Sequence, residues 1–200
     1  MKVKPKWIRK LSLKIGSVFR KIYAPVLFWF AWTFSIKKSL NPNEKKIAEQ
    51  KWNELYQSTS IKEFDERMRL LDIKWTSDAL NGLYDITYYN KPWLNFIPSV
   101  VEKFGRDCDD FAYMTFQWMQ RVGFAESDII LMMNPEVTSG HFIIAGKLNG
   151  DDENYIVKSN CNKSKSIKAN TLDEAIKTFV ETSWEEKDYV WVVYRKWRNK

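Results

Sequence analysis

Residues 105–122 read GRDCDDFAYMTFQWMQRV, and this stretch predicts an amphipathic helix over about residues 108–122. Asp107 is a good N-cap residue, and the acidic residues around it favour a helix N-terminus electrostatically. Gly123 is expected to end the helix, so Cys108 lies at its first position. The face expected to be buried consists of Phe111, Ala112, Phe116 and Met119.

The periodicity changes after this helix, from helical spacing to the spacing of strands. Asn149-Gly150, followed by two aspartates, is a strong signal for a β-hairpin between two of the expected strands. Thr171, with Glu174 three residues later, forms a capping box and predicts a helix over residues 171–182. Strands are expected at residues 129–133, 141–148, 155–159 and 189–196.

The chain before the cysteine helix is predicted to be largely helical. Residues 41–43 (NPN) break the chain and offer a cap for a helix over about residues 44–58, and a second helix is expected at 61–72. A turn at 90–93 leads into a short helix near 96–104. The expected fold class is therefore α+β, with a helical N-terminal region and the cysteine helix packed on an antiparallel sheet of about four strands.

Residues 1–21 form a predicted basic amphipathic helix, which is followed by an uncharged segment, Ile22–Ile36. This segment is short for a membrane-spanning helix, which needs about 20 apolar residues, and Pro25 interrupts it. Three interpretations remain open: an interfacial membrane anchor, a docking arm for a protein partner, or a part of the domain core that wraps back. We expect residues 1–40 to form an arm and residues 41–200 to form a catalytic domain.

Composition and charge narrow the function classes. Two hundred residues suffice for one globular domain plus an appendage. Residues 1–50 carry twelve Lys or Arg against two acidic residues, whereas residues 51–200 carry 20 basic and 23 acidic residues. Nucleic-acid enzymes carry their positive charge around the active region, so no nucleic-acid partner is expected. Two cysteines without Cys-x-x-Cys spacing provide no disulfide framework and favour a reducing, cytoplasmic compartment.

Cys108 and His141, which is the single histidine of the chain, are the leading candidates for catalytic residues. A helix N-terminus and a nearby imidazole favour the thiolate, which is the nucleophilic form of cysteine. His141 opens an expected strand whose hairpin partner ends at Asn160, so the sheet could hold these two side chains next to each other. The layout provides a nucleophile, a base and a group that orients the base.

Four segments stand out together: 91–93 (KPW), 107–112 (DCDDFA), 140–144 (GHFII) and 155–160 (YIVKSN). They resemble the transglutaminase-like cysteine protease superfamily, particularly its bacterial and phage members. The resemblance covers about residues 75–160 and implies a papain/transglutaminase-like core. It implies that Cys108 is the nucleophile, His141 the general base and acid, and Asn160 the orienting residue. The family usually has Asp at that third position, and an Asn can fix the imidazole tautomer but adds no negative charge.

Simpler interpretations stand beside this one. Cys108 could pack as a small buried hydrophobe, and the neighbouring aspartates oppose ionisation of its thiol. Asp107 and Asp109 are weak candidates for calcium ligands, because consecutive acids fall short of the six to eight oxygens that Ca²⁺ takes, and no other cofactor is expected. Cys161 follows a strand end and is assigned no catalytic role. Asp152 would be the orienting carboxylate only if the hairpin bent toward the site.

The leading functional prediction is a cysteine-dependent amide hydrolase, a peptidase or isopeptidase that forms an acyl-enzyme with a protein or peptide substrate. Interception of the acyl-enzyme by a lysine amine would give transglutamination instead. The alternative is a catalytically weak or inactive transglutaminase-like module with a structural role, associated with a virion, a membrane surface or a protein partner through residues 1–38. A cell-wall peptidase is a third class, although such enzymes continue with Ser-Gly after the cysteine, where this chain has Asp109-Asp110.

Overall fold

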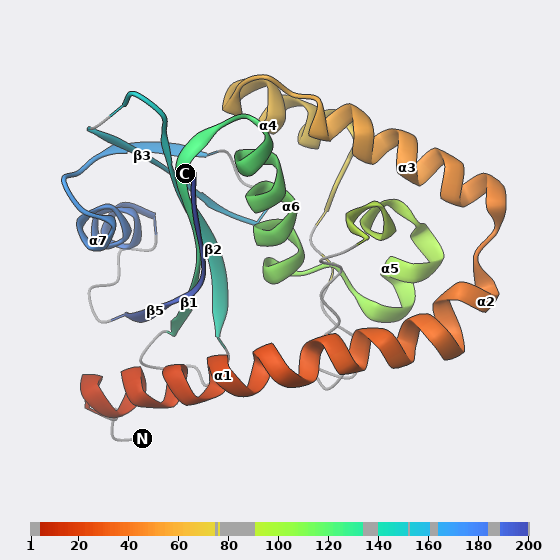
Figure 1. Cartoon of the computed structure of the whole chain (residues 1–200), viewed down its shortest axis with the longest axis horizontal. Helices are drawn as coiled ribbons and strands as arrows, with labels where there is room; N and C mark the ends of the chain where they lie inside the picture. Colours follow the sequence, from red (N-terminus) through yellow and green to blue (C-terminus); the bar gives the residue numbers. More distant parts are fainter. Residues whose placement is uncertain are drawn as a thin grey trace.

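In a computed structural model of the chain, an antiparallel β-sheet lies between helices on both of its faces (Figure 1). The structure describes residues 5–74, 76, 91–133, 140–151, 153–160, 164–183 and 189–199. Its helices are α1 (Lys6–Ala31), the π-helix η1 (Trp32–Ile36), α2 (Lys37–Ser39), α3 (Pro42–Tyr56), α4 (Ile61–Leu70), the 3₁₀-helix η3 (Pro92–Phe96), α5 (Pro98–Phe104), α6 (Cys108–Arg121) and α7 (Leu172–Ser183). Its strands are β1 (Phe124–Met133), β2 (His141–Leu148), β3 (Asn154–Ser159), β4 (Lys165–Lys168) and β5 (Val190–Arg198).

The five strands form one sheet in the order β4-β3-β2-β1-β5, and every neighbouring pair is antiparallel. β2 and β3 form the predicted hairpin, in which Gly150 has a φ of +82°. β1 begins at Phe124 rather than at Ile129, and β4 was not expected from the sequence. Only Ile167 of β4 is buried, so this strand gives no apolar alternation. The α+β class is confirmed, with five strands where the sequence predicts about four.

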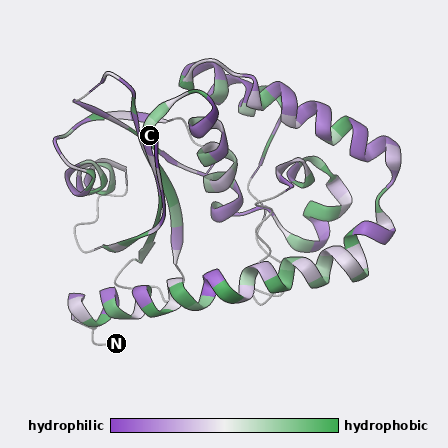
Figure 2. Ribbon diagram, viewed as in Figure 1, coloured by the Kyte–Doolittle hydropathy of each residue, from purple (hydrophilic) through white to green (hydrophobic). Residues whose placement is uncertain are grey.

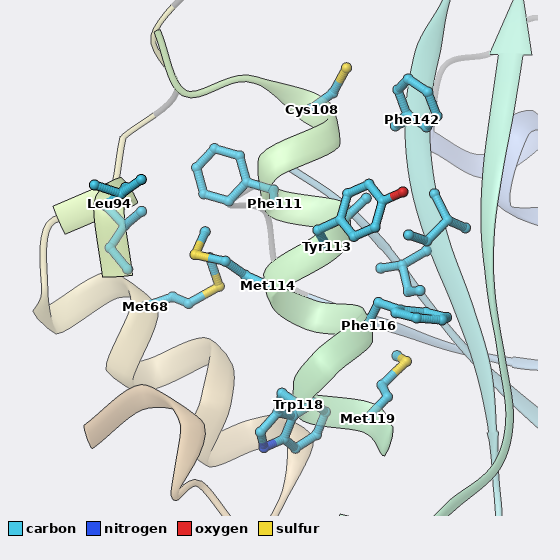
Figure 3. Close-up of a cluster of buried hydrophobic side chains, with 14 of the residues drawn as sticks. Met68, Leu94, Cys108, Phe111, Tyr113, Met114, Phe116, Trp118, Met119 and Phe142 are labelled. Atoms are coloured by element: carbon cyan, nitrogen blue, oxygen red, sulfur yellow. The ribbon is translucent and has the colours of Figure 1, made fainter. Parts of the chain in front are cut away.

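α6 is the predicted cysteine helix, and it packs against β1 and β2 (Figure 3). Asp107 caps the helix as predicted, because its side chain accepts the backbone N–H of Asp109 at 3.1 Å. Trp118 stacks on Phe64 of α4, with 4.5 Å between the ring centroids, and donates its indole N–H to the Ser58 carbonyl at 2.8 Å. Burial of a side chain of this size stabilises a fold by about 2–3 kcal/mol. The predicted inner face, Phe111, Ala112, Phe116 and Met119, is buried.

α7 covers the face of the sheet opposite to α6 (Figure 1). Glu174 at its start donates its backbone N–H to Thr171 Oγ1 at 3.2 Å, as the capping box predicts. Adjacent strand residues point to opposite faces, so Phe142 of β2 packs with α6 while Ile143 packs with α7. The side chains that α7 contributes to this second core are Ala175, Ile176, Phe179 and Val180.

α1 runs across the end of the sheet at which β1 finishes and β2 starts (Figure 1). It remains helical through Pro25, which the sequence predicts to interrupt this segment. Pro25 deprives the Lys21 carbonyl of its helical partner, and both residues are exposed, so water can bind that carbonyl and the helix continues. At the far end, Trp32 of η1 meets Trp93 of η3 edge-on, with 6.3 Å between ring centroids. The residues that α1 buries are Arg9, Leu13, Ser17, Ala24 and Phe28.

The outer face of α1 stays exposed, and Figure 2 shows apolar residues along the length of this helix. No helix in the described parts of the chain is long and apolar enough to cross a bilayer. The interpretations of residues 1–38 as a membrane anchor or as a docking arm concern this exposed face, and they stay predictions.

Candidate active site

Two of the catalytic residues proposed from the sequence lie on elements whose first residues are near α1. Cys108 is the first residue of α6, and His141 is the first residue of β2. Both lie at the end of the molecule that α1 covers (Figure 1). Figure 3 shows the Cys108 sulfur at the same end of α6 as the ring of Phe142, the residue that follows His141. The fold therefore brings these two positions of the chain to one region.

A network of hydrogen bonds to the backbone positions the start of α6. Arg106 is buried, and its guanidinium donates to the Lys74 carbonyl at 2.6 and 2.8 Å and to the Asn95 carbonyl. The backbone of Arg106 also pairs with Thr76 in a short antiparallel bridge. These contacts hold the turn before Cys108 and so position the first residue of α6.

The surroundings of the Cys108 thiol raise its pKa well above the ordinary value of 9.0. Burial is the largest cause, and the negative charges of Asp107 and Asp109 add to it. The backbone N–H of Phe142 and the guanidinium of Arg20 act in the opposite direction without outweighing these effects. The thiol is therefore protonated at neutral pH in this conformation, whereas the nucleophilic form is the thiolate.

The His141 ring contacts Ser159. Its Nε2 lies 2.8 Å from Ser159 Oγ, and the described residues include no hydrogen bond between the ring and the thiol. In the sheet register His141 pairs with Met132, which packs on the α7 side, whereas Cys108 belongs to the core on the α6 side. Burial lowers the pKa of His141 from 6.5 to about 4, so the ring is neutral at pH 7.

Asn160, the orienting residue expected from the sequence, directly follows Ser159, and its role stays a prediction. It follows β3 with a φ of +51°, and its Oδ1 is buried without a hydrogen-bond partner in the part of the chain that the structure describes. Ser159 pairs with Ile143 and therefore faces the same side of the sheet as His141. Sequence reasoning missed Ser159, although the hairpin signal combined with strand alternation could have identified it.

Arg20 of α1 closes this end of the protein, and no sequence motif singles it out. Its guanidinium lies 3.0 Å from Asp109 Oδ2 and 4.6 Å from the centroid of the Phe142 ring. The Asp109 side chain is 2% exposed and the Arg20 side chain 17%, so the pair is largely withdrawn from water. Arg20 thus joins α1 to the residue that follows Cys108 in α6 and to the residue that follows His141 in β2.

The acidic residues around Cys108 converge, and within the described parts of the chain they supply three carboxylates toward a metal site. Carboxylate oxygens of Asp107, Asp109 and Asp110 lie within 4.8 Å of one another. Three donors fall short of six to eight oxygens, and Asp109 is already paired with the Arg20 guanidinium. These residues therefore do not fit a calcium ion as they stand, and calcium binding stays a prediction from the resemblance.

Two sequence-based assignments concern residues outside the described parts of the chain. One is Asp152, the alternative orienting carboxylate, and the other is Cys161, which is assigned no catalytic role. Both assignments stay predictions.

Comparisons of the chain with models of protein families, with curated proteins and with solved structures find no match. The resemblance to transglutaminase-like cysteine proteases therefore rests on the four segments of sequence, and it stays a prediction.

Proposed function

We propose that the protein is a cysteine-dependent amide hydrolase, a peptidase or isopeptidase, with Cys108 as nucleophile and His141 as general base. The main support is that Arg20 contacts both Asp109, which follows Cys108, and the ring of Phe142, which follows His141. A helix N-terminus that carries a thiol and a strand that begins with an imidazole meet at this point, as a cysteine hydrolase requires. A transglutaminase-like core and a protein or peptide substrate belong to the same proposal.

The site is closed in this conformation, so the proposal includes a displacement of α1. Withdrawal of Arg20 from Asp109 admits water to the thiol. Because burial is the main cause of the raised pKa of Cys108, hydration moves that pKa back toward its ordinary value. Rotation of the His141 side chain away from Ser159, at the open end of β2, then brings the ring toward the thiol.

The proposed reaction is acyl transfer. The Cys108 sulfur attacks the amide carbonyl and gives its proton to His141, while backbone N–H groups at the start of α6 stabilise the oxyanion. His141 returns the proton to the leaving amine as the thioester forms. Water then attacks the thioester with His141 as base, which releases a carboxylic acid and the free thiol. An amine in place of water gives transglutamination, and the exclusion of water from the site sets the outcome.

Alkylation of the cysteines at about pH 5 to 9, read by mass spectrometry with Cys161 as internal control, tests the proposal. Cys108 should react slowly in the wild type, faster in Arg20→Met, and slowly again near neutral pH in Arg20→Met/His141→Ala. Lys21→Met, which changes the next residue along α1, is the matched control and should behave as the wild type. Arg20→Met should also cleave members of a fluorogenic peptide library, and the additional substitution Cys108→Ala should abolish that cleavage.

The alternative is a catalytically weak or inactive module with a structural role, and two observations favour it. The thiol is protonated, and the imidazole lies on the opposite side of the sheet against Ser159. In that case Arg20→Met exposes Cys108, but the additional substitution His141→Ala leaves the rate of Cys108 alkylation unchanged, and no peptide is cleaved. That pair of results would exclude the hydrolase.

A further inference from the structure

The large apolar side chains that remain exposed are concentrated on one face of α1 and η1. Outside α1 and η1, the exposed large apolar side chains among the described residues are Ile47, Leu70 and Leu148. A soluble protein rarely leaves a continuous apolar patch uncovered unless the patch binds something. The residues of this outer face are Trp7, Leu11, Ile15, Val18, Phe19, Ile22, Tyr23, Val26, Trp29, Phe30 and Phe34.

The outer face is long and straight, and it carries positive charge along one edge. α1 has 26 residues, which corresponds to a length of about 39 Å. Lys10, Lys14 and Lys21 are exposed and follow Trp7, Leu11 and Val18 at a spacing of three residues, so they border the apolar side chains. Residues 5–43 contain eight basic residues and no acidic one, and Arg20 among them pairs with Asp109 of α6. The surface therefore combines apolar area with the positive charge of Lys10, Lys14 and Lys21 along its edge.

We propose that the outer face of α1 binds the surface of an anionic lipid bilayer, with the helix axis parallel to the membrane plane. Apolar side chains of such a helix enter the boundary between headgroups and acyl chains, and lysines at its edge meet the anionic headgroups. Trp7 and Trp29 lie far apart along the helix, and indole rings favour that interfacial depth. The buried face of α1 meanwhile stays on the protein.

The charge distribution argues against a second copy of the chain as the occupant. Two outer faces packed together would bring their lysine edges close without any acidic residue of the helix between them. A spanning helix is also unsuitable, since α1 carries Lys6, Arg9, Lys10, Lys14, Arg20 and Lys21 along its length.

Vesicle flotation with the full chain tests the proposal. The wild type should float with phosphatidylcholine vesicles that contain about one third phosphatidylglycerol, and much less with phosphatidylcholine alone. Ile22→Asp, at a side chain 65% exposed, should weaken binding at least about tenfold. Leu70→Asp on α4, at a side chain 68% exposed, is the matched control and should leave binding unchanged. Lys10, Lys14 and Lys21 changed together to Gln should weaken binding on the order of 100-fold.

Circular dichroism and light scattering complete the experiment. Both aspartate variants should keep the wild-type helix content, because each changes an exposed side chain. Absence of flotation, equal binding to neutral vesicles, or equal loss in the Leu70→Asp control would overturn the proposal. So would a wild-type dimer that does not float and that Ile22→Asp dissociates, since this result would assign the face to a second copy.

Discussion

Acidification will destabilise the protein through His141. Folding lowers the pKa of this ring from 6.5 to about 4 because the ring is buried. Between these two values the unfolded chain binds a proton that the folded protein does not bind, so acid favours unfolding. The contribution of the neutral ring to the free energy of unfolding is fully present above pH 6.5 and is lost as the pH falls toward 4. At about 1.4 kcal/mol per pKa unit, the loss from pH 7 is about 2 kcal/mol at pH 5 and about 3 kcal/mol at pH 4.

Two measurements check this expectation. His141 is the only histidine, so its ring resonance in an NMR titration reports one group, and it should stay constant from pH 7 to about pH 5. The free energy of unfolding, measured in urea at about pH 7 and pH 5, should fall by about 2 kcal/mol more for the wild type than for His141→Gln. The Gln side chain does not titrate and can still form a hydrogen bond with Ser159. A ring that titrates near 6.5, or equal losses in both proteins, would refute the burial argument.

Three further sets of substitutions test other contacts by urea unfolding. Asp65→Ala removes the carboxylate 2.6 Å from the buried ammonium of Lys158, so we expect a loss of about 3 kcal/mol, and a loss below 1 kcal/mol would contradict this. Arg20→Met should cost about 2 kcal/mol, and a double-mutant cycle with its carboxylate partner should show coupling of at least about 1 kcal/mol. Gly123→Ala, at a φ of +83°, should destabilise the protein by about 1 kcal/mol, whereas Gly16→Ala within α1 should stabilise it by about 0.5–1 kcal/mol. Two changes in the free energy of unfolding with the same sign would refute the backbone argument.

Local signals in the sequence predicted most of the elements near the candidate site. Asp107 and Gly123 marked the two ends of α6, and both act through hydrogen bonds or a backbone angle within a few residues. Asn149-Gly150 marked the β2–β3 hairpin for the same reason, since a turn of this type depends on its own residues. The α+β class then followed from helices before α6 and strands after it.

The contacts of the candidate site depended on parts of the chain that no local pattern connects. The pair between Arg20 and Asp109 joins α1 to α6, and nothing in either segment specifies the other. The choice of Ser159 over Asn160 depends on a one-residue step in the β2–β3 register, which changes the face of every side chain. Whether His141 faces the cysteine helix is decided by its pairing with Met132 of β1, so composition and spacing alone could not settle it.

The packing of α1 against β5 has a consequence for synthesis. β5 follows α1 by about 160 residues and forms the edge of the sheet beside β1. At about 5–20 residues per second, a ribosome needs roughly 10–30 s to make β5 after α1 has been made. During that interval the inner face of α1 lacks β5, against which it packs in the folded protein, while all residues of the outer face have already been made. On the growing chain, the proposed binding of the outer face to a membrane surface would therefore precede the completion of the fold.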